Sequence, residues 1–343
     1  MNSSKYASII LLSIGIFFIL FIGKSIILPF VFSILFYYII RSIRRLIDRN
    51  KFLQEKIPDW SKHLLASIIL FGMFFSIVNT IVINAPNLPL EIIKHSKNIT
   101  HLSSSLKGFL GEVYTLKLLN TIQTFDYSSI TNYILSSFST FISDVMLVIF
   151  YVLFLFFEQN KFKSKLKMMF KSEEKHTNTI TIFRNIEHTM IQYIGIKTLI
   201  SLISATICFF IMYFMNLKLP LLWATGVFVF SYIPVIGTFF AVILPFSFSI
   251  IQYGNFSSSI LLLVLLSTML LTVTNLIEPR IAGKSLNISP LVALISLSVW
   301  GSLWGFSGMI ISVPLTVMII ILFANFENTK AIAILLSNDG NVE

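Results

Sequence analysis

Residues 219–252 read LPLLWATGVFVFSYIPVIGTFFAVILPFSFSIIQ, an apolar run of 34 residues without a charged side chain. A transmembrane helix needs about 20 such residues, so this run is too long for one upright crossing. Pro234 and Gly237 interrupt it, and irregular backbone at membrane depth is tolerated where it is buried in protein or lines a cavity. The run therefore predicts a membrane protein with a broken helix or a re-entrant hairpin. Two ordinary kinked helices would give the same pattern.

A second over-long run, residues 288–326, contains Gly301, Gly305, Gly308 and Pro314. The spacing of Gly301 and Gly305 is typical of close contact between membrane helices. We therefore expect these three glycines to serve helix packing. Two broken segments in the C-terminal half also resemble the discontinuous helices that form solute sites in transporters.

The composition agrees with a membrane protein. Of the 343 residues, 56% are apolar and 12% are charged, whereas soluble domains have about 45–50% and about 25%. A soluble globule of this size could not bury so much apolar surface. We therefore exclude soluble enzymes, disordered regulators and disulfide scaffolds. The predicted fold class is an all-α, polytopic integral membrane protein.

Charge between the apolar runs predicts the orientation of the chain. Residues 41–62 carry seven basic against three acidic side chains, and residues 158–190 carry seven against four. By the positive-inside rule both segments are cytoplasmic, which places residues 84–140 outside and the N-terminus inside. The other predicted parts are three N-terminal membrane helices within residues 1–83 and a fourth membrane helix at 141–157. A C-terminal membrane core follows at 191–326, and a cytoplasmic tail at 327–343.

Both long connecting segments have helical periodicity. In the outward segment, Leu102, Leu106, Phe109 and Val113 recur at helical spacing, which predicts helices that project from the bilayer. In residues 158–190, lysines interleave with apolar residues, and an apolar stripe continues to Ile194. A basic amphipathic helix of this kind is typical of a segment that lies on an anionic inner leaflet.

Patterns for catalysis, cofactors or nucleic acid are missing from the sequence. The histidines lack H-E-x-x-H spacing, no G-x-S-x-G occurs, and a single cysteine cannot form a metal cluster. The net charge of +10 comes from cations that flank apolar runs, which favours membrane orientation over a nucleic-acid surface. We predict neither an enzyme nor a cofactor, metal or nucleic-acid partner.

Polar residues in an apolar context mark a candidate pathway. Between residues 190 and 277 the only charged side chains are two lysines. The end of this stretch and the residues after it bring Asn275, Glu278, Pro279 and Arg280. An isolated charge at bilayer depth costs about 2.5–3.5 kcal/mol, so such groups pair or face water. We predict that Pro279 ends the helix, that Glu278 pairs with Arg280, and that both line a solute route. Two interfacial charges would explain the same pattern.

The break around Pro234 and Gly237 is the second candidate. Because proline lacks an N–H group and glycine favours turns, we expect bare carbonyls and amides there that could contact a solute or ion. A simple turn between two short spans is the alternative.

The run NLIEPRIAGKSLNISPLVALISLSVWGSLWGFSGMIISVPLTVMI (275–319) and the stretch SYIPVIGTFFAVILP (231–245) resemble motifs of the autoinducer-2 exporter (AI-2E) family. The resemblance implies a permease of the bacterial inner membrane with about eight transmembrane helices and both termini in the cytoplasm. It also implies a homo-oligomer, such as a pentamer, and a small polar solute or a monovalent cation as substrate.

The leading hypothesis is a permease that exports an autoinducer-2-like solute by alternating access. The alternative within transport is a sodium or lithium ion/proton antiporter with Glu278 as the proton site. A hypothesis of another class is a membrane-anchored scaffold that binds a partner through residues 84–140. Removing residues 84–140 distinguishes a scaffold from a transporter, since a scaffold then loses its function and a transporter keeps it.

Overall fold

The computed structural model describes residues 3–49, 58–95, 98, 145–159, 161–162, 164–165, 168, 173–234, 236–282 and 287–341. Every regular element within these ranges is helical, which confirms the predicted all-α class. Six helices there are long and apolar enough to cross a membrane, and two shorter apolar helices accompany them, Val145–Gln159 and Pro220–Phe230. The chain is therefore a multi-pass membrane protein.

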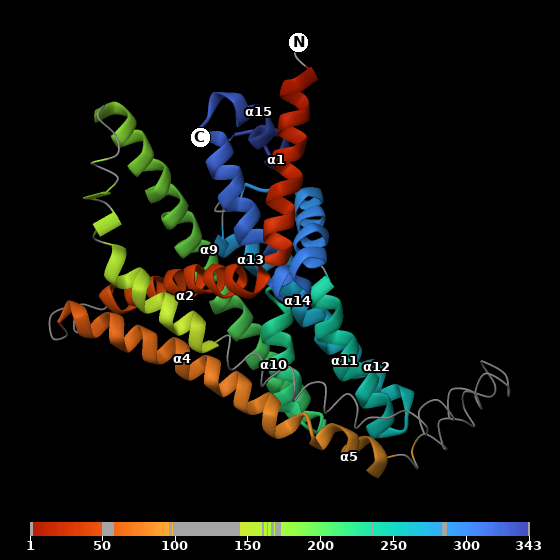
Figure 1. The fold of residues 1–343 in the computed structure, drawn as a ribbon. Coiled ribbons are helices and arrows are strands. Elements are labelled where there is room, and N and C mark those ends of the chain that lie inside the picture. Colours follow the sequence, from red (N-terminus) through yellow and green to blue (C-terminus); the bar gives the residue numbers. More distant parts are fainter. Residues whose placement is uncertain are drawn as a thin grey trace. The chain divides into compact units, whose positions relative to one another are not determined.

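The chain forms two compact units whose boundary falls within helices α4 (Asp59–Asn84) and α9 (Glu173–Phe214). The first contains α1 (Ser3–Ile22), α2 (Lys24–Arg49), helix Val145–Gln159, the first part of α9, α14 (Pro290–Ala324) and α15 (Glu327–Leu336) (Figure 1). The second contains α5 (Asn87–Lys94), the rest of α9, α10 (Pro220–Phe230), α11 (Ile236–Tyr253), α12 (Phe256–Thr272), η1 (Val273–Ile277) and α13 (Glu278–Ala282).

In the first unit, α2 continues past the end of its apolar run to Arg49, so the predicted basic segment 41–62 begins as helix. Ion pairs accompany this extension. Arg44 Nε lies 3.5 Å from a carboxylate oxygen of Asp48 one turn away, and Arg41 pairs with Glu187 of α9. Leucine, isoleucine and arginine favour helix, and charge pairs at this spacing add to it.

The apolar stripe that leads into α9 packs in the protein interior. Ile186, Met190 and Ile194 are buried in one cluster with Leu35 of α2 and Trp304 of α14. This part of the stripe therefore contacts protein, and the contact of residues 158–190 with an anionic leaflet stays a prediction. An amphipathic pattern specifies one apolar face, and here that face is covered by other helices of the same unit.

Helix α14 folds back on itself at Gly305, which has φ 63° and ψ −143°, a conformation that glycine adopts without steric cost. The indole Nε1 of Trp300 donates to Oγ1 of Thr316 at 3.1 Å, although a straight helix would separate these residues by about 24 Å. A Cβ atom on Gly308 would overlap the Trp300 carbonyl. The predicted break in residues 288–326 is confirmed, and its two halves form an antiparallel hairpin.

In the second unit, α10 and α11 form another antiparallel hairpin. Trp223 packs against Phe248 with ring centroids 5.3 Å apart, and Phe230 stacks on Phe240 at 5.8 Å. These pairs run in opposite directions along the two helices, so the chain reverses between Phe230 and Ile236. The predicted break at Pro234 is thus confirmed. Because α10 has 11 residues, it is about 16 Å long, roughly half of a 30 Å hydrocarbon core.

A second reversal joins α11 to α12, and the two helices lie side by side (Figure 1). Gly254 has a positive φ of 66°, and the side chain of Asn255 accepts a hydrogen bond from the Ser258 amide to cap α12. α12 therefore returns to the level of the turn at 231–234 and continues through η1 into α13. A buried apolar cluster, which includes Cys208, Val227 and Leu266, holds α9, α10 and α12 together.

Of the predicted outward segment 84–140, the structure describes residues 84–95 and 98. Its helix α5 contributes the buried Ile92 to the same apolar cluster. Asn98 donates its side-chain amide to the Gln252 carbonyl at 2.7 Å, which fastens the start of the segment to the end of α11. The helices predicted farther along this segment lie outside the described residues.

Candidate functional site

A cavity of about 40 Å³ opens within the second unit, at the end where α11 begins and α12 ends. A water molecule needs about 10–15 Å³ by this measure, so the cavity has room for about three waters or a small ion. Its lining residues come from α9, the turn at 231–234, α11, α12, η1 and α13: Lys197, Ile200, Ser204, Ser231, Ile233, Pro234, Thr238, Leu270, Val273, Thr274 and Glu278.

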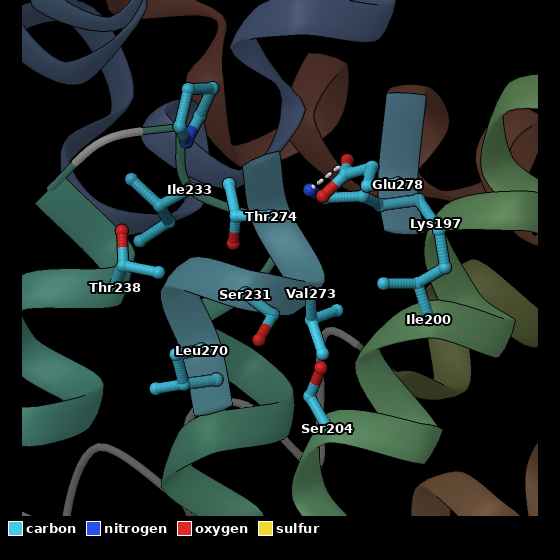
Figure 2. Close-up of a pocket in the computed structure, with 11 residues that line it drawn as sticks. Lys197, Ile200, Ser204, Ser231, Ile233, Thr238, Leu270, Val273, Thr274 and Glu278 are labelled. Carbon is cyan, nitrogen blue, oxygen red and sulfur yellow. Dashed lines mark hydrogen bonds and ion pairs between the residues drawn. The ribbon is translucent and has the colours of Figure 1, made fainter. Parts of the chain in front are cut away.

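An ion pair lies at this cavity. Nζ of Lys197 lies 2.5 Å from Oε1 of Glu278, and Figure 2 shows the lysine side chain extending from α9 toward the carboxylate. The two side chains are 13% and 22% exposed, so both charges are largely removed from solvent. Desolvated charges are stable only when paired, and each of these groups supplies the counter-charge that the other needs.

Hydroxyl groups supply the rest of the polarity. Ser204, Ser231, Thr238 and Thr274 surround the cavity from four different elements. The Ser231 hydroxyl donates to the Val227 carbonyl at 2.6 Å and keeps its lone pairs available for other donors or ions. The arrangement can therefore bind water, a hydroxyl-bearing solute or a small cation.

Pro279 acts through the helix that precedes it. The chain continues as helix through Glu278–Ala282, so the predicted helix end at Pro279 is wrong. The chain accommodates Pro279 through the π-helical turn η1, in which the Glu278 amide donates to the Val273 carbonyl. Because Pro279 has no N–H, the amides of residues 278 and 279 are both unavailable to the Thr274 carbonyl.

The turn at Pro234 contributes differently from the prediction. The Ile233 amide donates to the Phe230 carbonyl at 2.9 Å, and the Gly237 amide donates to the Ile233 carbonyl at 3.2 Å. These carbonyls are therefore not bare, and the turn presents side chains to the cavity instead. A Cβ atom on Gly237 would overlap the Phe230 carbonyl, so this buried glycine permits the tight reversal.

The predicted site residues separate into two groups. Glu278 and Pro234 line the cavity, whereas Asn275, Pro279 and Arg280 are exposed and are not among its lining residues. The predicted pairing of Glu278 with Arg280 is wrong, because the described partner of Glu278 is Lys197. Side chains two positions apart on a helix do not face each other, while Lys197 approaches Glu278 from another helix.

Sequence reasoning missed Lys197 and the polar face of α9 to which it belongs. Lys197, Ser201 and Ser204 recur at helical spacing, and all three side chains are buried or nearly so. The hydroxyl of Ser201 is buried without a hydrogen-bond partner in the described structure. The signal was present in the sequence, since Lys197 is one of two charged residues between positions 190 and 277.

With this geometry established, comparison with known proteins identifies the family. The model of the AI-2E family transporter matches residues 7–328, nearly the whole chain. The chain belongs to the AI-2E transporter family. Membrane transport is the role of this family, and the predicted resemblance is confirmed.

Relatives of this AI-2E transporter are themselves described as transport proteins. A candidate transport protein of Haemophilus influenzae is 29% identical over 335 residues, covering 94% of this chain and 92% of the relative. The AI-2 transport protein TqsA of Escherichia coli is 30% identical over 60% of this chain and 58% of its own length. A sodium-lithium/proton antiporter of Halobacillus andaensis is 20% identical over 66% of this chain and 65% of its own.

Proposed function

We propose that this protein is a permease that exports a small polar solute, such as autoinducer-2, by alternating access. The observation that carries the proposal is the hydroxyl-lined cavity with its Lys197–Glu278 pair inside an otherwise apolar helical unit. Charges at membrane depth are expensive and mark solute or ion pathways. The relative named as an AI-2 transport protein supports the choice of solute.

The ion pair and the hairpin turn suit a gate. A cavity of about 40 Å³ is smaller than a sugar-sized solute, so such a solute requires the cavity to widen. Separation of Lys197 from Glu278 would open it and would offer an ammonium and a carboxylate to hydroxyl groups of the solute. We place the protein in the bacterial inner membrane with both termini in the cytoplasm, supported by the basic segments 41–62 and 158–190.

The second candidate function is exchange of a monovalent cation for protons. The cavity volume favours it, because the space fits a sodium or lithium ion without rearrangement. Small hard cations prefer oxygen ligands, and the Glu278 carboxylate and the hydroxyls of Ser231 and Thr274 supply them here. The antiporter among the relatives supports the same candidate.

Flux measurements in reconstituted vesicles test both candidates. Vesicles are loaded with autoinducer-2, with ²²Na⁺ or with lithium chloride, and efflux is followed with and without an imposed proton gradient. Solute efflux that exceeds that of protein-free vesicles supports the permease, and cation efflux driven by the proton gradient supports the antiporter. Fluxes equal to those of protein-free vesicles for all three loads would contradict both candidates.

A further inference from the structure

Lys197 occupies the position at the cavity where a transported cation would meet Glu278. Its ammonium group lies 2.5 Å from the carboxylate, among the hydroxyl-bearing residues Ser204, Ser231 and Thr274. An ammonium ion and a sodium ion carry the same charge and seek the same oxygen ligands. Although the empty volume admits a small ion, two like charges within a few ångströms of each other at one largely desolvated carboxylate repel strongly.

We propose that Lys197 is a built-in competing cation, which gives up one proton for each sodium or lithium ion that binds Glu278. This inference rests on the second function proposed above and adds its coupling residue and its stoichiometry. It is built on the contact between α9 and α13, which nothing in the motif around Glu278 reveals.

The charge balance of the exchange follows from the cavity. Before binding, the Lys197 ammonium and the Glu278 carboxylate sum to zero. When a monovalent cation takes the carboxylate, a lysine that stays charged is left without its partner in a largely desolvated place. Release of one proton from the Lys197 ammonium then restores neutrality at the cavity. One cation enters, one proton leaves, and the exchange at the cavity is electroneutral.

Other ionisable groups do not replace Lys197 in this role. Lys197 and Glu278 are the only ionisable side chains among the cavity residues that the structure describes, from α9 to α13. The hydroxyl of Tyr232, on the turn beside the cavity, donates to Oγ1 of Thr198 at 2.7 Å. Arg280 and Lys218, on neighbouring parts of the second unit, are exposed.

Proton release on cation binding tests the inference with purified full-length protein in detergent at pH 7. Sodium or lithium chloride is added in weak buffer, with choline chloride as the ionic-strength control, and released protons and bound ²²Na⁺ are both counted. The wild type is expected to release about one proton per bound cation. Lys197→Gln is expected to bind about tenfold more tightly, about 1.4 kcal/mol, and to release none.

Two further variants separate competition from a structural role. Lys197→Arg keeps the charge and the fold but cannot lose its proton, so it is expected to block cation binding. A merely structural lysine would instead be rescued by arginine. Lys218→Gln removes an exposed cation of the same unit and is expected to behave as the wild type.

Three results would overturn the inference. They are equal proton release by wild type and Lys197→Gln, normal cation binding by Lys197→Arg, and absence of cation binding in both wild type and Lys197→Gln. Failure of the proposed function is seen separately, in the vesicle fluxes of the wild type. A wild type that transports while Lys197→Arg transports equally well leaves the permease standing and removes only the coupling role.

Discussion

A single contact, between Nζ of Lys197 and Oε1 of Glu278, places two opposite charges in a cavity lined mainly by hydroxyl and apolar groups. Exposed ion pairs contribute at most about 1 kcal/mol, and breaking a buried pair costs about 3–5 kcal/mol. With side chains 13% and 22% exposed, this pair lies between the two cases. An intermediate strength of this kind suits the proposed gate, which has to hold the cavity closed and still break during transport.

A double-mutant cycle measures this strength. Lys197→Gln and Glu278→Gln are each expected to lower the free energy of unfolding by about 1–3 kcal/mol, because each leaves a partly desolvated charge behind. The double variant should lose less than the sum of the two. Unfolding in detergent, followed by circular dichroism, gives the four values.

Arg280→Gln is the matched control, since the Arg280 side chain is exposed. It should change the unfolding free energy by no more than about 0.5 kcal/mol. A coupling energy of zero between Lys197 and Glu278, or a loss at Arg280 as large as at Lys197, would contradict the described pairing.

At the scale of elements, the reversals of two helical hairpins lie where proline and glycine in the sequence predicted a break. Pro234 and Gly237 bracket the reversal between α10 and α11, and Gly305 allows the reversal inside α14. These breaks were predictable because proline and glycine act locally, through a missing donor or a missing Cβ. The π-helical relief around Pro279 was not, since proline inside a helix usually ends it.

Contacts between helices could not be predicted from the sequence, because they depend on how distant segments pack. Lys197 and Glu278 are 81 residues apart, and only the packing of α9 against the end of α12 brings them together. Arg280, two residues from Glu278, was the nearer choice along the chain. Likewise, the stripe through Ile186 and Met190 showed an apolar face without showing whether lipid or protein covers it.

The reversal between α10 and α11 is so tight that it has no room for a side chain at Gly237. In Gly237→Ala the new Cβ would overlap the Phe230 carbonyl, so the turn must open. Overpacking of this kind costs about 1–3 kcal/mol, and we expect a lower melting temperature together with reduced transport.

Gly226→Ala, in α10 of the same hairpin, is the control. Its Cβ would meet the Phe230 ring at 3.8 Å, an ordinary contact, so stability and transport should hold. A Gly237→Ala protein that melts and transports as Gly226→Ala does would show that the turn is not tightly packed.

At the scale of the whole molecule, the candidate pathway is assembled within one stretch of sequence, residues 196–283 of the second unit. The first unit holds the basic segments 41–62 and 158–190, whose charge predicts the cytoplasmic side.

Cysteine labelling checks that orientation. Ser104→Cys should react with a membrane-impermeant maleimide added outside intact cells, and Ser172→Cys only after the membrane is opened, because residues 41–62 and 158–190 carry the basic excess. The native Cys208 is fully buried and should stay silent in both. Labelling of both positions from the same side would refute the orientation.

The role of the cavity in transport is tested most directly with the loaded vesicles described above. Efflux of whichever load the wild type transports is compared among vesicles with equal amounts of Glu278→Gln, Lys218→Gln or wild-type protein. Glu278→Gln removes the carboxylate that the cavity holds beside Lys197, whereas Lys218→Gln removes an exposed charge of the same unit. We predict that Glu278→Gln slows efflux by about tenfold or more, since losing a paired charge costs more than about 1.4 kcal/mol. Lys218→Gln should match the wild type. Efflux at the wild-type rate from a folded Glu278→Gln protein would show that the solute does not pass this cavity.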